Sequence, residues 1–129
     1  MKNIPLAGAI FNISGGICII FFLDLLSPYL TLEPSSNMIF RLFVGGTAIL
    51  FGMGYINVFR NPENHISMLM HGAVLKVWAF IISVFCYLHY GLSLLMLLGF
   101  GFGNLTLAIL FALYIKQNRD IVFAEKSAS

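Results

Sequence analysis

Charged side chains are scarce in this sequence. Only 9% of the 129 residues are Asp, Glu, Lys or Arg, whereas 60% are hydrophobic. A soluble domain carries about 25% charged residues, and without them it would expose large apolar patches and aggregate. The scarcity of charge therefore excludes a soluble globular fold and favours an integral membrane protein.

Cysteine patterns and basic tracts are also missing. The two cysteines, Cys18 and Cys86, lie inside apolar runs, and there is no CxxC or Cys/His pattern, which excludes a dithiol redox site and a structural zinc site. No two histidines have the spacing of metal ligands, so we expect no metal site. The net charge is +2 without a basic cluster, so we expect no nucleic-acid partner.

What the sequence does contain is four long apolar runs. Each is near the ~20 residues that an α-helix needs to cross a hydrocarbon core of about 30 Å. The predicted spans cover about 4–26, 38–59, 66–90 and 92–115, and a polar tail covers 116–129. Because the connections are short, successive helices should pack as antiparallel neighbours. The sequence predicts an all-α fold, a transmembrane four-helix antiparallel bundle in a single domain over 1–129.

Proline, glycine and polar residues predict where the spans end. Asp24 and Pro28 should end the first span, since proline does not continue a helix at low cost. The stretch 60–65 contains Pro62 and is expected to be a loop, and Gly91 is expected to form a tight turn.

The distribution of Lys and Arg predicts the orientation. Four spans place the N-terminus, the second connection and the C-terminus on one side, with five basic residues: Lys2, Arg60, Lys116, Arg119 and Lys126. The opposite side has Arg41 alone. Since cytoplasmic segments carry the excess of Lys and Arg, we expect a multi-pass protein with both termini in the cytoplasm, in a bacterial inner membrane.

Lys76 is the most informative polar residue. It lies about ten residues into the third span, ~15 Å along the helix and close to mid-membrane. Ionisable groups at this depth are rare and costly, so each one is a functional hypothesis. Asn12, Ser14 and Asn104 reach similar depths, and we expect a polar layer around Lys76 if their faces turn inward. No carboxylate occurs at this depth, so a bound anionic ligand is one candidate partner, and a purely structural role is the alternative.

The depth of the other polar residues in the membrane indicates their expected roles. His71 lies closer to the cytoplasmic side, level with Tyr55. Both are candidate ligand contacts, and a simple hydrogen-bonding role is the alternative for His71. Asp24 and Arg41 share the outer level, and we expect them to form a structural ion pair because each would otherwise be a lone charge at the lipid boundary. The glycines of the spans predict close helix packing, with an apolar ligand groove as the alternative.

Several of these stretches carry a family resemblance. Gly52-Met53-Gly54-Tyr55, the segment 61–65, the segment 72–76 and Gly103-Asn104 resemble the DoxX-like group of small four-helix membrane proteins. The resemblance implies a four-helix bundle and a connection to quinones or other apolar ligands. In similar sequences an Asp often stands where this chain has Asn104, so the resemblance gives no support for a proton relay here.

These observations favour a small membrane protein that is not an enzyme. We expect it to bind a lipid-like ligand or to act as an accessory subunit of a membrane complex, without a cofactor. The partners expected are membrane lipids, other membrane subunits or further copies of the chain. The alternative is a quinone- or lipid-linked membrane enzyme, with quinone as its cofactor. A proton or small-cation transporter is disfavoured because the mid-membrane level lacks a carboxylate.

Overall fold

The computed structural model describes residues 2–30 and 38–128, with side chains described for 2–28, 38–63 and 65–118. Every element in these ranges is helical. In chain order they are α1 (Ile4–Ile17), the π-helix η1 (Cys18–Phe22), α2 (Leu23–Leu30), α3 (Met38–Arg60), α4 (Pro62–His89), α5 (Leu94–Met96), the π-helix η2 (Leu97–Phe102) and α6 (Gly103–Ala128).

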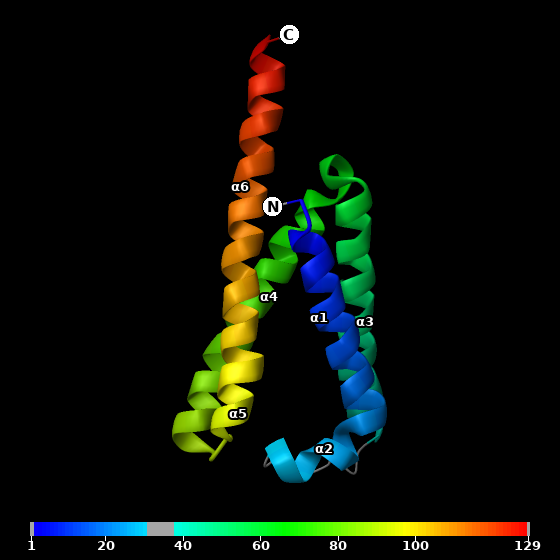
Figure 1. Cartoon of the computed structure of the whole chain (residues 1–129), viewed down its shortest axis with the longest axis vertical. Helices are drawn as coiled ribbons and strands as arrows, with labels where there is room; N and C mark the ends of the chain where they lie inside the picture. The colour runs from blue at the N-terminus through cyan, green and yellow to red at the C-terminus, as the bar shows by residue number, and fades with distance from the viewer. Residues whose placement is uncertain (1, 31–37, 129) are drawn as a thin grey trace.

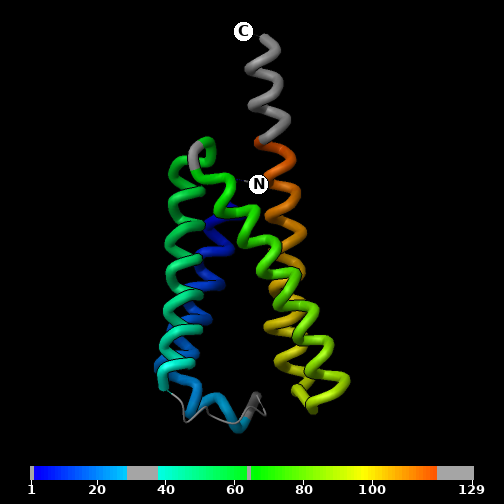
Figure 2. The backbone as a smooth tube through the Cα atoms, turned by 180° about the vertical axis from the view of Figure 1, so that it is seen from behind, coloured from blue at the N-terminus to red at the C-terminus, as the bar shows by residue number. Residues whose placement is uncertain are grey.

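The long helices form two antiparallel pairs, α1 with α3 and α4 with α6 (Figure 1). The start of α1 and the connection from α3 to α4 lie at one end of the bundle, called here the terminal end. α2 and α5 lie at the opposite, distal end. The two pairs meet toward the terminal end and diverge toward the distal end, and the view from behind shows the same divergence (Figure 2).

Glycines bring the helices of each pair together. A Cβ on Gly16 of α1 would lie 2.6 Å from the carbonyl oxygen of Gly45 on α3, and a Cβ on Gly101 would lie 3.0 Å from the Cβ of Ser83 on α4. Helices in lipid associate through such close approaches of small residues, because lipid supplies no hydrophobic drive between them. The predicted role of glycine in helix packing is therefore confirmed.

The two pairs are joined by a core near the terminal end. The buried hydrophobic cluster draws on all four long helices, with Ala9, Tyr55, Val58, Leu69, Leu107, Phe111 and Tyr114 as its members. Gly8 of α1 and Gly72 of α4 leave the space that the rings of Phe111 and Tyr55 fill, because a Cβ at either glycine would overlap those rings.

Four helical segments are long and apolar enough to cross a membrane. They are Ile4–Pro28, Met38–Arg60, His65–His89 and Leu94–Asn118, each of 23–25 residues. Large apolar side chains such as Phe21, Phe43 and Leu88 are about 70% exposed. A surface of this kind is stable only against lipid. The chain is a small four-span integral membrane protein, and the predicted all-α antiparallel bundle is confirmed.

The first span differs from the prediction at Pro28, which lies inside α2 instead of ending the helix. Proline lacks the N–H that would bond the carbonyl four residues earlier, which is that of Asp24. The Ser27 hydroxyl donates to this carbonyl oxygen at 3.1 Å and so replaces the missing donor. The expectation that Pro28 ends the helix was wrong because a neighbouring side chain compensates for the proline.

The other helix ends also differ from the prediction. The expected loop over 60–65 reduces to Asn61, since Pro62 starts α4 at a position where the proline needs no backbone donor. α6 extends well beyond residue 115, through the predicted polar tail, and no glycine or proline follows Gly103 in the sequence to interrupt it. Gly91, with φ of 72°, lies in the expected turn after α4.

Candidate functional site

The Lys76 side chain lies where the two helix pairs meet. It projects from the middle of α4 and is only 2% exposed. Its ammonium donates to Oδ1 of Asn12 on α1 at 2.7 Å and to Oδ1 of Asn104 on α6 at 3.2 Å. One lysine thus links three helices, and the structure brings together three of the residues that the sequence singles out.

Backbone groups hold the two asparagines in place. The Asn104 amide donates to the Phe100 carbonyl oxygen at 2.7 Å, and the Asn12 amide donates to the Ala48 carbonyl oxygen at 3.4 Å. Both amide groups therefore present their oxygen atoms to Lys76. This arrangement suits a protonated amine, which has three donors and no acceptor.

Three aromatic rings complete the surroundings of the ammonium. The Lys76 Nζ atom lies 5.0 Å from the ring centroid of Phe11, 5.6 Å from that of Phe111 and 5.7 Å from that of Tyr55. Aromatic faces attract cations at such distances, by about 0.5–2 kcal/mol each depending on desolvation. The rings and the amide oxygens stabilise the charge but do not cancel it.

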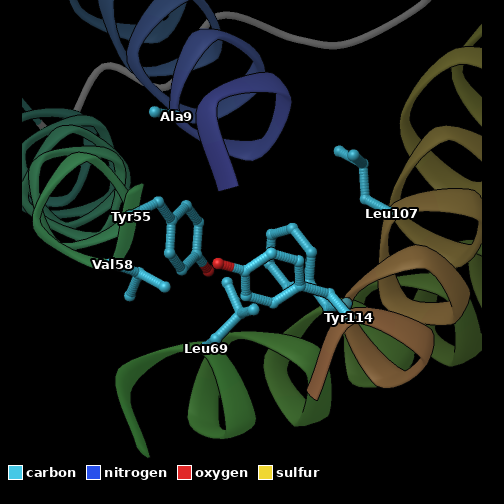
Figure 3. Close-up of a cluster of buried hydrophobic side chains, with 7 residues drawn as sticks. Ala9, Tyr55, Val58, Leu69, Leu107 and Tyr114 are labelled. Atoms are coloured by element: carbon cyan, nitrogen blue, oxygen red, sulfur yellow. The ribbon is translucent and has the colours of Figure 1, made fainter. Parts of the chain in front are cut away.

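The Lys76 layer, defined as Lys76 with Asn12, Asn104 and these rings, has two donors without an acceptor. The described residues provide two oxygens for the three N–H groups of Lys76, and none of their carboxylates pairs with it. The hydroxyl of Tyr55, a residue that is 0% exposed, also has no hydrogen-bond partner. Figure 3 shows the hydroxyl ends of Tyr55 and Tyr114 pointing toward each other. Buried donors of this kind are costly and call for an acceptor.

Two residues that the sequence associates with Lys76 lie outside the layer. Ser14 is exposed, and its hydroxyl donates to the Phe11 carbonyl oxygen of its own helix at 3.2 Å. His71 is also exposed, and its Nδ1 lies 2.8 Å from the Ser67 carbonyl oxygen. Depth alone groups these side chains with Lys76, but their directions around α1 and α4 separate them.

Asp24 and Arg41 lie together at the distal end. Arg41 Nη1 is 3.2 Å from Asp24 Oδ1, and the guanidinium also donates to the Ile19 carbonyl oxygen at 3.3 Å and to that of Ile20 at 3.1 Å. Both carbonyls belong to η1, where the wider π-helical turn disturbs the regular α-helical hydrogen bonds. The pair thus joins α3 to the bend between α1 and α2.

Two residues that surround Lys76 could not be foreseen from the sequence. Phe11 and Phe111 belong to apolar runs, and the sequence offers no signal that separates them from the other phenylalanines. The two π-helices are also without an evident sequence signal. Among the residues that the structure describes, no group of three His, Cys, Asp or Glu side chains is placed to hold a metal ion.

Comparison with known proteins identifies no relative. No family model matches the chain, and neither the curated proteins nor the solved structures contain a significant match. The resemblance to the DoxX-like group therefore stays a prediction that these comparisons do not support.

Proposed function

We propose that this protein binds a lipid-like carboxylate within the bilayer, with Lys76 as the counter-charge. The observation that carries the proposal is a buried ammonium near mid-membrane without a carboxylate partner among the described residues. An unpaired charge in a medium of low dielectric constant is costly, and an anion removes much of that cost.

The polar layer favours a carboxylate over an uncharged head group. The third N–H of Lys76 has no acceptor among the described residues, and a carboxylate oxygen supplies one together with the missing negative charge. A quinone carbonyl accepts hydrogen bonds as well, but it leaves the charge of Lys76 uncompensated. The runner-up ligand is therefore a quinone, and the same experiment distinguishes the two.

The proposal is tested by native mass spectrometry of the full chain in mild detergent with palmitate or a long-chain ubiquinone. We expect palmitate to be retained and Lys76→Met to lower its apparent affinity by about tenfold or more, equivalent to about 1.4 kcal/mol. Lys116→Met is the matched control, because Lys116 is exposed, and it should retain palmitate fully.

A second variant covers the case in which Lys76→Met does not fold. Asn104→Asp places a carboxylate at the position of an oxygen that already lies 3.2 Å from Lys76 Nζ. We expect this internal counter-charge to keep the protein folded and to exclude palmitate. Undiminished palmitate retention by a folded Lys76→Met or Asn104→Asp variant would contradict the proposal, and retention of ubiquinone alone would support the quinone alternative.

A further inference from the structure

The inner faces of α1 and α6 change from closed to open at the level of the Lys76 layer. On α1, a Cβ at Gly8 would overlap the Phe111 ring, whereas a Cβ at Gly15 would have no atom within 4 Å. Seven residues make about two helical turns, so Gly8 and Gly15 lie on the same face. The face is therefore packed on the terminal side of Asn12 and open on its distal side.

α6 with η2 shows the same change on the facing side. A Cβ at Gly103 would lie 3.2 Å from the Phe11 ring of α1, whereas a Cβ at Gly99 would again have no atom within 4 Å. These two glycines are about one turn apart and share a face. The change occurs next to Asn104, so both helices open at the same level.

The arrangement of the helices explains this change. The two pairs diverge from the terminal end toward the distal end (Figure 2), and the buried cluster that joins all four helices lies on the terminal side. Toward the distal end, the close approaches occur within pairs, as between Gly16 and Gly45 or between Gly101 and Ser83. The Lys76 layer therefore marks the boundary between the closed and the open part of the bundle.

We infer that the ligand is a single-chain fatty acid whose carboxylate lies at the Lys76 layer and whose tail runs toward the distal end between the two helix pairs. This inference rests on the proposed function and adds the direction of the molecule and its number of tails. On the distal side of the layer, Phe22 of η1 and Phe100 of η2 are exposed apolar side chains. Acyl chains are stabilised against such side chains and against the lipid that enters from the sides.

The closed part of the bundle excludes the opposite direction. A tail running toward the terminal end would have to displace the fully buried Tyr55, Val58, Leu69 and Phe111. A two-chain phospholipid is also disfavoured, because its glycerol and second chain need more room beside Lys76 than a single carboxylate does, and Lys76 is only 2% exposed. The tail of the bound fatty acid therefore lies at the level of the distal leaflet.

The inference is tested by photo-crosslinking in nanodiscs with two palmitate analogues, one carrying a diazirine beside the carboxylate and one carrying it at the methyl end. Adducts of the full chain are mapped by tandem mass spectrometry, and only those displaced by excess palmitate are counted. We expect the carboxyl-proximal probe to label the level of Asn12 and Gly15. We expect the methyl-end probe to label Phe22 and Phe100.

Variants at the open glycines test the same inference without a probe. Gly15→Leu and Gly99→Leu place side chains in the open space and should each lower palmitate retention by about tenfold. Gly46→Leu is the matched control, because its Cβ position on α3 is equally open. Gly46 lies roughly two and a half turns from Tyr55, and so on the face of α3 opposite to the core. Palmitate retention and the melting temperature of Gly46→Leu should equal those of the unchanged protein.

The outcomes separate this inference from the proposed function. Displaceable methyl-end adducts on Val58, Leu69 or Tyr114 would overturn the inferred direction while leaving carboxylate binding intact. Unchanged palmitate retention in the Gly15→Leu and Gly99→Leu variants would also overturn it. A complete lack of displaceable adducts, together with no palmitate retention in native mass spectrometry, would overturn the proposed function as well.

Discussion

At the scale of single residues, two cations lie in different surroundings within the bundle. Lys76 has amide oxygens and aromatic rings around it, whereas Arg41 has a carboxylate and two backbone carbonyls. Arginine suits the second place because its planar group donates in several fixed directions at once. Lysine suits the first because its compact ammonium fits between rings and amide oxygens.

Arg41 should contribute to stability mainly through the carbonyls of η1. Asp24 is 69% exposed at its side chain, and exposed ion pairs contribute about 0–1 kcal/mol. We therefore expect Asp24→Asn to change the free energy of unfolding by less than about 1 kcal/mol. Arg41→Met should lower it by about 1–3 kcal/mol, because the Ile19 and Ile20 carbonyls then lose their donor.

Unfolding of the two variants is measured by circular dichroism during titration with SDS in mixed micelles. Arg41→Lys serves as the control, since it keeps the charge and loses the forked geometry. A loss for Asp24→Asn as large as that for Arg41→Met would show that the ion pair, and not the carbonyl contacts, holds η1 to α3.

At the scale of helices, packing depends on which of two consecutive glycines faces the partner helix. A Cβ at Gly45 would lie 2.9 Å from the Gly16 carbonyl oxygen and would overlap the Ile20 side chain, whereas Gly46 has open space beside it. Gly45→Ala should therefore lower the free energy of unfolding by about 1–3 kcal/mol, because α1 and α3 must separate.

Gly46→Ala is the matched control for that prediction. Alanine favours the helix over glycine by about 0.5–1 kcal/mol, so we expect this variant to be as stable as the unchanged protein or slightly more stable. Thermal unfolding in one detergent gives the comparison. Equal losses for the two variants would contradict the assignment of Gly45 to the contact between α1 and α3.

At the scale of the whole molecule, the exposed basic residues predict the orientation. Lys2, Arg60 and Lys116 lie toward the terminal end of the bundle, and an excess of Lys and Arg marks the cytoplasmic side. We expect GFP fused after Ser129 to be fluorescent. Alkaline phosphatase fused at the same position should be inactive. An active phosphatase fusion would reverse the orientation and would place the inferred tail of the fatty acid at the level of the cytoplasmic leaflet.

The membrane class, the number of spans and the level of Lys76 within the third span were determined by the sequence alone. Hydrocarbon thickness fixes the length of an apolar helix, and the cost of a charge in lipid makes one lysine conspicuous. Depth along a helix also follows from counting residues, which is why Asn12 and Asn104 were grouped correctly with Lys76. These properties depend on local composition and on a fixed rise per residue.

Direction around the helix axis was decided only by the tertiary structure. Ser14 and His71 have suitable depths but are exposed, and the rings of Phe11 and Phe111 face Lys76 although nothing in the sequence distinguishes them. Pro28 remains helical because Ser27 supplies a donor, and the two π-helices shift the register of their spans. Which faces meet, and where the two pairs diverge, depends on packing between residues far apart in the chain. That packing makes the Lys76 layer the boundary between the closed and the open part of the bundle.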